Sequence, residues 1–200
     1  MEFQIVAGEL CLDFVNTLDY RLFPERRKEL LPSYQDLADW AAHAGSISAT
    51  QRTALSREAE AHPQAAARVR NKAVELRECL YRIIDSTAHN RRPPADDLVM
   101  LNRYRVEAFS NEELKGTRRG FRLEWKDEPL QLDSVLWPIV QSASALLTSP
   151  DLQNVHECDM ETCRWLFVDR SKNHRRRWCD MKICGNRAKA RTFYRRQSRA

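Results

Sequence analysis

Residues 158–187 read CDMETCRWLFVDRSKNHRRRWCDMKICGNR. Cys158 and Cys163 form one pair, Cys179 and Cys184 form a second, and each pair encloses four residues. Fifteen residues separate the two pairs, a spacing typical of a structural zinc site in which four thiolates complete a tetrahedron. Thiolate is a soft ligand that favours Zn²⁺ over Mg²⁺ or Ca²⁺. The pattern therefore predicts a structural zinc ion on these four cysteines, with no open coordination position for catalysis.

Two alternative uses of these cysteines are disulfide bonds and an iron–sulfur cluster. Disulfides require an oxidising compartment, and the first residues, MEFQIVAGELCLDF, have acids within the apolar run and lack the basic segment of a signal peptide. An iron–sulfur cluster takes the same ligands, but the sequence carries no redox-partner motif, so zinc is the stronger prediction. No stretch approaches the roughly 18 apolar residues of a membrane span. We therefore expect a cytoplasmic protein that is not inserted in a membrane.

Other sulfur and imidazole side chains are expected outside the metal site. Cys11 and Cys79 each stand alone among apolar neighbours, as buried cysteines that act as small hydrophobic residues usually do. His156 and His174 lie close to the cysteine pairs and could replace one as a ligand. Because four cysteines are already paired, we expect both histidines at the surface or facing phosphate.

The charge of the chain is concentrated near the cysteine pairs. Its 200 residues contain 33 Lys and Arg against 28 Asp and Glu, a net charge of +5. Residues 1–150 carry 20 basic against 22 acidic side chains, whereas residues 151–200 carry 13 against 6. A basic block of this kind is typical of segments that bind nucleic-acid phosphates or anionic membranes, and a solvated basic tail is the alternative.

The sequence around the cysteines predicts a small module. Residues 164–169, rich in aromatic and β-branched side chains, predict a strand, residues 170–174 a turn, and residues 175–179 the returning partner strand. Asn186 is the predicted N-cap of a helix over residues 187–196. Knuckle, hairpin, knuckle and helix in this order indicate a treble-clef or ribbon-like zinc finger, in which the metal supplies most of the folding free energy.

Basic side chains follow both the predicted turn and the predicted helix. On the helix, Arg187, Arg191 and Arg195 recur every four residues and form one stripe. Arginine binds phosphate through two nitrogens and reads guanine edges in the major groove. Contact with phosphates alone, without reading the base sequence, is the alternative. The predicted nucleic-acid-binding residues are Arg175, Arg176, Arg177, Arg187, Lys189, Arg191, Arg195 and Arg196.

The first 150 residues predict helices. Ser33 and Ser48 each begin a capping-box pattern, and apolar residues recur at helical spacing from about Gln64 to His89. A further helix is expected after Asp96, and Pro138 suits the first turn of a last one.

One β-hairpin interrupts these helices. Residues 120–125 alternate between apolar and polar side chains, and a turn near residues 127–129 leads to a return over residues 130–132. Helices with a single hairpin predict a mainly α fold, a helical N-terminal domain with a small C-terminal zinc finger, and not a doubly wound sheet.

Both ends of the chain resemble known families. Cys179-x4-Cys184-Gly-Asn-Arg, with Trp178 before it and Lys189 after it, resembles the signature of the CGNR zinc finger, and residues 158–169 fit the same pattern. Residues 8–17, GELCLDFVNT, resemble the opening of the ABATE domain, which precedes a CGNR finger in bacterial stress-induced transcription regulators. The resemblance implies an ABATE-like domain over residues 1–150 and a DNA-binding zinc finger over residues 151–200.

The polar members of the N-terminal motif are candidates for a ligand site. Asp13 and Asn16, together with Arg21, could line a pocket for a small molecule in a sensing domain. The alternative is that Asp13 and Asn16 tie the first helix by local hydrogen bonds. For the N-terminal domain as a whole, we expect a role in ligand sensing or in the formation of a homodimer.

The leading hypothesis is a transcription regulator that binds DNA through its zinc finger. The alternative is a zinc-stabilised module that binds RNA or an acidic protein partner. The sequence has no Walker loop, glycine-rich nucleotide motif, nucleophile elbow or His-Glu-x-x-His motif. We therefore predict that the protein is not an enzyme, and a catalytic N-terminal domain tethered to the finger is the weakest hypothesis.

Overall fold

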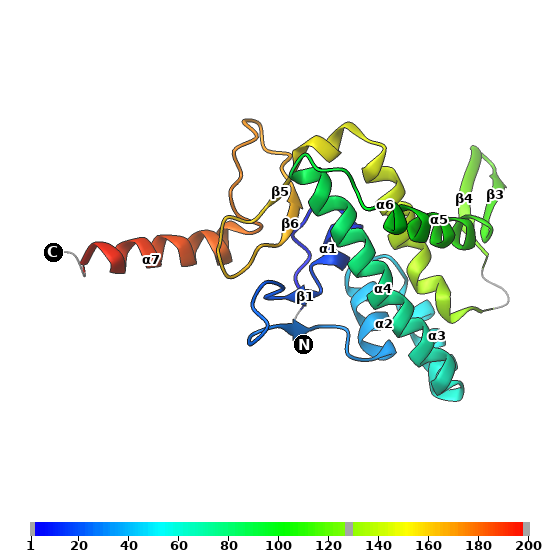
Figure 1. Cartoon of the computed structure of the whole chain (residues 1–200). Coiled ribbons are helices and arrows are strands. Elements are labelled where there is room, and N and C mark those ends of the chain that lie inside the picture. Colours follow the sequence, from blue (N-terminus) through cyan, green and yellow to red (C-terminus); the bar gives the residue numbers. More distant parts are fainter. Residues whose placement is uncertain (1–2, 127–129, 198–200) are drawn as a thin grey trace.

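The computed structural model describes residues 3–126 and 130–197. Helices dominate the described chain and the strands are short, so the predicted mainly α fold is confirmed. The elements, labelled in Figure 1 where there is room, are α1 Leu10–Val15, β1 Leu18–Asp19, β2 Lys28–Glu29, α2 Tyr34–His43, α3 Ala49–Ala61, α4 Pro63–Ala88, α5 Ala95–Phe109, β3 Glu112–Thr117, β4 Gly120–Trp125, η1 Leu132–Leu136, α6 Trp137–Leu147, η2 Pro150–Asn154, β5 Val155–Glu157, β6 Leu166–Val168, η3 Met181–Gly185 and α7 Asn186–Gln197.

The N-terminal helices begin where their capping residues predict. Ser33 and Ser48 each accept a hydrogen bond from the backbone N–H three residues on, and the side chains of Asp36 and Gln51 return the bond to the cap. Pro63 opens α4, since a proline at the first helical position loses no intrahelical hydrogen bond. The resulting α4, 26 residues long, is the central helix against which α1, α2, α3 and α5 pack.

A single buried cluster extends from these helices into the zinc-finger segment. Leu76, Leu80 and Ile84 of α4 lie in it at 0% exposure, and so do Phe167 and Cys158 near the C-terminus. The strand β6 packs against α1, and Figure 1 shows β5 and β6 on that side of the helical domain. The finger is therefore packed into the same core as the helical domain.

The predicted N-terminal hairpin forms with a different partner strand. Residues 120–125 are a strand, but β4 pairs with β3, residues 112–117, and not with residues 130–132. The predicted turn at residues 127–129 lies outside the described residues. The segment Glu112–Thr117 is mostly polar and so gave no alternating apolar signal.

The predicted hairpin between the cysteine pairs is wrong. β6 pairs antiparallel with β5, so that Val155 lies opposite Val168, and residues 175–179 form no strand. Asp169 explains the difference, because its buried carboxylate accepts the N–H groups of Ser171 (2.8 Å) and Arg176 (2.7 Å). These hydrogen bonds fold residues 170–178 into a loop instead of a ladder.

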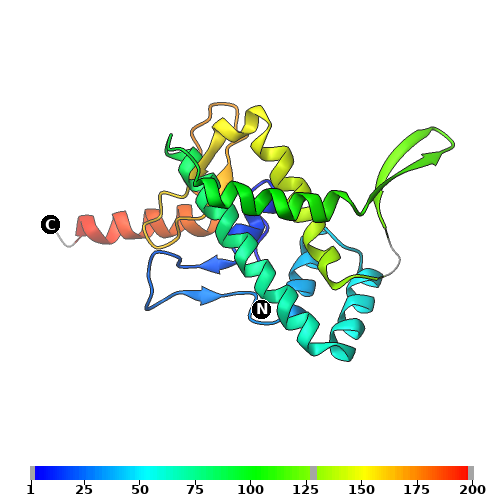
Figure 2. The ribbon, with the colours of Figure 1, turned by 45° about the vertical axis from the view of Figure 1, so that its right-hand side comes forward.

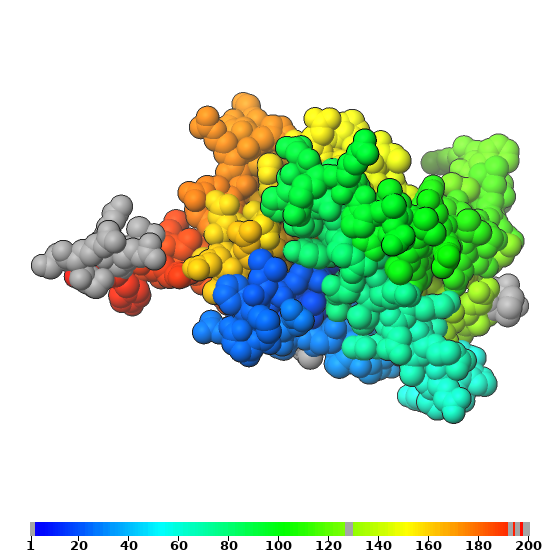
Figure 3. Space-filling model, in the orientation of Figure 1, coloured from blue at the N-terminus to red at the C-terminus, as the bar shows by residue number. Residues whose placement is uncertain are grey.

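The C-terminal helix begins earlier than predicted. Asp180, and not Asn186, is the capping residue: its side chain accepts the N–H of Ile183 at the start of the wide turn η3. Asn186 is already helical, and its amide donates to the carbonyl of Lys182 (2.8 Å). The helix α7 then projects from the body of the molecule, as Figures 2 and 3 show.

Within the described ranges no helix combines the length and apolar character needed to cross a membrane.

Candidate metal centre and basic arm

The structure brings the four predicted ligands together. The sulfur atoms of Cys158, Cys163, Cys179 and Cys184 all lie within 4.8 Å of one another, and all four residues are buried. The sulfur of Cys179 is 3.6 Å from that of Cys163 and 3.6 Å from that of Cys184. A tetrahedral zinc with Zn–S bonds of about 2.3 Å needs sulfurs about 3.8 Å apart. The donor set and its spacing therefore fit Zn²⁺.

Tight turns place each pair of sulfurs. In the first, Cys158 donates its N–H to Trp165 (2.8 Å) and Cys163 donates to Met160 (2.8 Å), while Arg164 adopts a left-handed conformation (φ 61°) that reverses the chain. In the second, Gly185 lies so close to Met181 that a Cβ would stand 2.4 Å from its sulfur. The sequence between the ligands thus folds around the metal position.

Each of these thiols affects the ionisation of its neighbours. Hydrogen bonds with Cys163, Cys179 and Cys184 lower the pKa of Cys158. Hydrogen bonds with its own three neighbours, first of all Cys158, raise the pKa of Cys163. Four adjacent thiolates repel one another unless a cation shares their charge. Zn²⁺ is such a cation, and its binding would hold all four ligands deprotonated.

Family comparisons agree with this geometry at both ends of the chain. Residues 8–150 match the ABATE family model, described as "Putative stress-induced transcription regulator", and residues 154–197 match the CGNR zinc finger. The chain belongs to the ABATE family. It ends in a CGNR zinc finger, whose clustered cysteines can hold the zinc ion. Both families are of regulator or zinc-finger type and neither is a family of enzymes. No curated protein matches the chain.

The ABATE motif residue Asn16 binds the CGNR finger directly. Its amide nitrogen donates to the carbonyl of Leu166 (2.9 Å), and its amide oxygen accepts the N–H of the same residue (3.0 Å). Two residues further along the strand, Val168 donates its N–H to the carbonyl of Ala7 (2.8 Å). β6 is therefore paired with β5 on one edge and held by the ABATE motif on the other.

Asp13 organises the N-terminal segment that meets the finger. Its carboxylate accepts the N–H groups of Val6 (2.8 Å) and Ala7 (2.9 Å) and is only 4% exposed. Burial raises the pKa of Asp13 to about 6, although the two backbone hydrogen bonds act in the opposite direction. The other side of this segment faces the finger, because Arg176 donates to the carbonyl of Val6 (3.0 Å).

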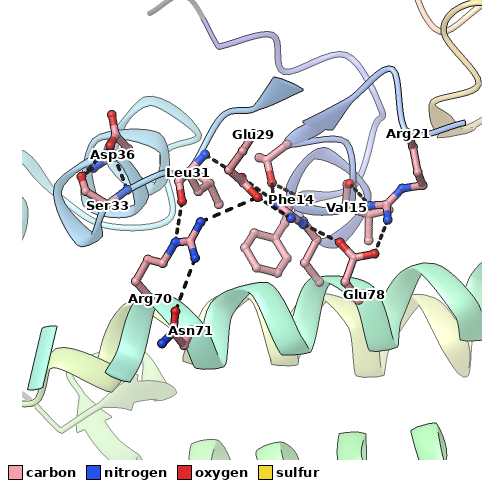
Figure 4. A network of polar contacts seen from close by, with 12 residues as sticks. Phe14, Val15, Arg21, Glu29, Leu31, Ser33, Asp36, Arg70, Asn71 and Glu78 are labelled. Atoms are coloured by element: carbon pink, nitrogen blue, oxygen red, sulfur yellow. Dashed lines mark hydrogen bonds and ion pairs between the residues drawn. The ribbon is translucent and has the colours of Figure 1, made fainter. Parts of the chain in front are cut away.

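Arg21 contributes to an ion-pair network on α4. It pairs with Glu78, donates to the carbonyl of Val15 (3.1 Å), and stacks its guanidinium 4.0 Å from the ring of Tyr81. Figure 4 shows Arg21, Val15 and Glu78 converging on the helix. The neighbouring Arg77, 1% exposed, forms two 2.7 Å bonds to Glu29. The three residues predicted to bind a ligand are thus used in contacts within the protein.

The larger cavities of the ABATE domain lie elsewhere. One of about 700 Å³ opens between α3, the base of β4 and the start of α6, with Leu55, Trp125 and Trp137 in its wall. Its lining includes neither Asp13, Asn16 nor Arg21. A cavity of this size suits a small molecule, and no pattern in the sequence identifies it, because its lining residues come from distant segments.

The predicted basic surface divides into inward and outward residues. Arg176 points inward: it donates to the carbonyls of Trp178 (2.9 Å) and Cys179 and stacks 4.5 Å from the ring of Phe167. Its neighbour Arg175 is exposed, and Arg177 is exposed but paired with Asp159 (2.6 Å).

The helix α7 carries the remaining predicted basic residues. Arg187, Lys189 and Arg191 lie on it, and Arg191 pairs with Glu161 at 3.2 Å. Arg175 and Lys189 form no ion pair with another residue whose side chain is described. Arg195 and Arg196 lie outside the described side chains.

The lone cysteines and the histidines are not part of the metal cluster. Burial raises the pKa of Cys11 to about 12 and that of Cys79 to about 11, so both stay protonated as predicted for buried hydrophobic residues. His174 is exposed and contacts the carbonyl of Asp169, whereas His156 is half-buried beside Phe167.

Proposed function

We propose that this ABATE-family protein regulates transcription by binding duplex DNA through its CGNR finger. The observation that carries the proposal is the basic helix α7, which projects from the body directly after the cysteine cluster (Figure 3). From residue 186 to residue 200 the sequence has six Lys and Arg and no acid. Zinc bound to Cys184, just before α7, would fix the orientation of this helix relative to the body.

The dimensions of α7 suit a DNA groove. Its 12 residues span about 18 Å at 1.5 Å per residue, and a major groove about 12 Å wide accepts one α-helix. The helix extends from η3 and makes its main packing contacts there. Polyanionic DNA matches the charge of this helix, because its phosphates attract Lys and Arg.

The proposed interface is smaller than the predicted one. It leaves out Arg176, which uses its guanidinium on backbone carbonyls, and Arg177, which is paired with Asp159 at 2.6 Å. Arg191 stays in the set because its pair with Glu161 is longer, at 3.2 Å, and Arg195 and Arg196 stay in it from the sequence alone. The proposed DNA-binding residues are Arg175, Arg187, Lys189, Arg191, Arg195 and Arg196.

Binding to a duplex in a salt series tests the proposal. We expect an affinity that falls steeply with salt, because each neutralised phosphate releases a counterion. Zinc chelation or the substitution Cys179→Ser should abolish binding, and Cys79→Ser is the matched control at a buried cysteine outside the cluster. Binding that survives metal removal, or that lacks a salt slope, would overturn it.

RNA or an acidic protein is the alternative partner. Competition between duplex DNA, structured RNA and an acidic polypeptide of equal charge distinguishes the three. A selection of bound duplexes shows whether bases are read or only phosphates are contacted.

We further propose that residues 1–150 form the regulatory part and residues 151–200 the DNA-binding part. The support is the pair of hydrogen bonds between Asn16 and Leu166 of β6. Through them a conformational change in the helical domain would be transmitted to the finger. A cytoplasmic location is part of the proposal, because a reducing compartment keeps thiolate ligands available for zinc.

A further inference from the structure

The β3–β4 hairpin is exposed on both faces. Figures 1 and 2 show it projecting from the body on the side opposite α7. Directly opposed residues share a face, so Leu114, Phe121 and Leu123 lie together on one side, and Trp125 continues that side to the base, where its ring is 5.7 Å from that of Trp137. Yet Leu114, Phe121 and Leu123 are 65%, 77% and 59% exposed.

The pairing of β3 with β4 alone gives this hairpin little stability. An isolated two-stranded hairpin is marginally stable in water, and independent stability comes with three or more strands that share an apolar face, or with packing against a helix. Among the residues that the structure describes, neither outer edge of the hairpin is paired with a further strand, and such edges readily pair with another chain. Pairing with a further strand would therefore stabilise the β3–β4 hairpin.

The phase of the ladder shows which backbone groups are free. Lys126 donates its N–H to the carbonyl of Asn111 (2.8 Å), one step beyond the pair Glu112–Trp125. Bonded and non-bonded pairs alternate in an antiparallel ladder. Phe121, Leu123 and Trp125 therefore belong to non-bonded pairs, and their N–H and C=O groups point away from β3.

The sequence of β4 is complementary to itself when read in the opposite direction. In an antiparallel pairing of two copies centred on Leu123, the two Leu123 residues meet through their free backbone groups. Phe121 then lies opposite Trp125 of the partner subunit, and Arg122 opposite Glu124 of the partner subunit. All three pairs match apolar with apolar or basic with acidic side chains. β3 offers Leu114 as its only large apolar side chain, so the β4 edge is the better one.

We propose that β4 pairs with β4 of a second copy of this chain, which gives a four-stranded antiparallel sheet across a two-fold axis. The occupant of the exposed edge is the same chain, and the sheet combines the apolar faces of both hairpins. The proposal is independent of DNA binding by the finger, since the hairpin and α7 project on different sides of the molecule.

Sedimentation velocity of the zinc-loaded full chain, over a concentration series, provides the first test. We expect a reversible monomer–dimer equilibrium. Arg122→Glu places like charges opposite each other across the axis, and so does Glu124→Arg, so each variant alone should dimerise at least about tenfold more weakly.

An equal mixture of the two variants is the decisive sample. In a mixed dimer one copy carries an acid at both positions 122 and 124 and the other carries a base at both, so every cross-axis pair is again of opposite charge. Dimerisation should therefore return. Mixing does not change contacts within a hairpin, where the wild-type Glu124 pairs with Lys115 (3.2 Å) and with Arg122.

Recovery in the mixture thus reports contact between copies. A wild-type chain that stays monomeric at every concentration, or a mixture no better than its components, would overturn the proposal.

Proline substitution identifies the edge. Leu123→Pro removes an N–H that the hairpin itself does not use, and Leu114→Pro does the same on the opposite edge. We expect only Leu123→Pro to prevent dimerisation. If Leu114→Pro alone prevents dimerisation, the choice of the β4 edge is overturned. If both proline variants are monomeric, the mixture of Arg122→Glu and Glu124→Arg shows whether β4 pairs with β4.

Discussion

The ionisation of Asp13 depends on the fold, because its carboxylate is buried there. Burial raises its pKa to about 6 from an ordinary value of 3.8, so the folded state holds a proton more tightly than the unfolded state. The charged carboxylate therefore opposes folding above pH 6, and this cost is relieved as the pH falls from about 6 towards 4. The backbone N–H groups it binds need an acceptor and not a charge.

We predict that Asp13→Asn stabilises the protein at pH 7, because an amide oxygen can accept both hydrogen bonds without a buried charge. The advantage should shrink by about 1 kcal/mol between pH 7 and pH 5, where the wild-type carboxyl becomes neutral. Urea unfolding of both proteins at the two pH values measures it. An advantage that does not change with pH would contradict the prediction, and Asp13→Ala, which loses the acceptor, should be destabilised at both.

We predict that Asn16→Ala destabilises the protein by about 2–4 kcal/mol, since it leaves the N–H and the C=O of Leu166 buried without a partner. Zinc affinity should fall as well, because Leu166 begins β6, three residues after the ligand Cys163. Thr17→Ala is the control: its hydroxyl donates to the carbonyl of Phe14 and accepts from Arg77, and since both partners belong to the helical domain, zinc affinity should be unchanged. Equal zinc affinities for the two variants would contradict the role of Asn16.

Among the elements, α7 and the loop before it carry side chains of the same type with different roles. We predict that Lys189→Gln leaves stability unchanged, weakens duplex binding and lowers the slope of log affinity against log salt by about 0.9. Arg119→Gln, at the tip of the distant hairpin, is the matched control with an unchanged slope.

Arg176→Gln should instead lower the free energy of unfolding, since the arginine bonds three backbone carbonyls. Denaturant unfolding and fluorescence anisotropy with a labelled duplex separate the two effects. The prediction fails if Arg176→Gln changes only the affinity.

The elements also show what the sequence could predict. Capping boxes and helical periodicity depend on neighbours three or four residues apart, so Ser33 and Ser48 identified their helices correctly. The cysteine spacing likewise predicted the metal cluster. Strand pairing depends on distant partners: β6 was predicted to pair with residues 175–179 because the role of Asp169 as an acceptor cannot be read from a run of arginines.

For the candidate site residues, the sequence predicted the type of chemistry, but only partly the direction and partners of the side chains. Arg176 was assigned to nucleic acid by charge alone, yet its surroundings turn it inward. Asp13 and Asn16 carried no signal to separate a ligand-binding role from a structural one, since polar residues in an apolar helix serve both. Their partners, Val6, Ala7 and Leu166, explain them only once the fold brings the two ends together.

For the whole molecule, the shared core makes zinc a determinant of global stability. We predict that chelation lowers the melting temperature of the helical domain as well as that of the finger, because one buried cluster contains both. At about 2–4 °C per kcal/mol for a chain of this size, a loss of a few kcal/mol gives a drop of about 10 °C. Far-ultraviolet circular dichroism, dominated by the helices, measures it.

Cys163→Ser should reproduce the low melting temperature and show no further drop on chelation. A helical transition that is indifferent to the metal would contradict the shared core.

The hydrogen bond between Val168 and Ala7 has a consequence for synthesis. The ribosome delivers Ala7 long before Val168, so the segment that contains Ala7 waits for its partner while the residues between them are translated. The cysteines flank Val168 in the sequence. Zinc binding and the pairing of Val168 with the segment before α1 therefore belong to the same late step. A nascent chain stalled before residue 158 should consequently remain open to proteolysis at its N-terminus, and release of the finger from the exit tunnel should protect it.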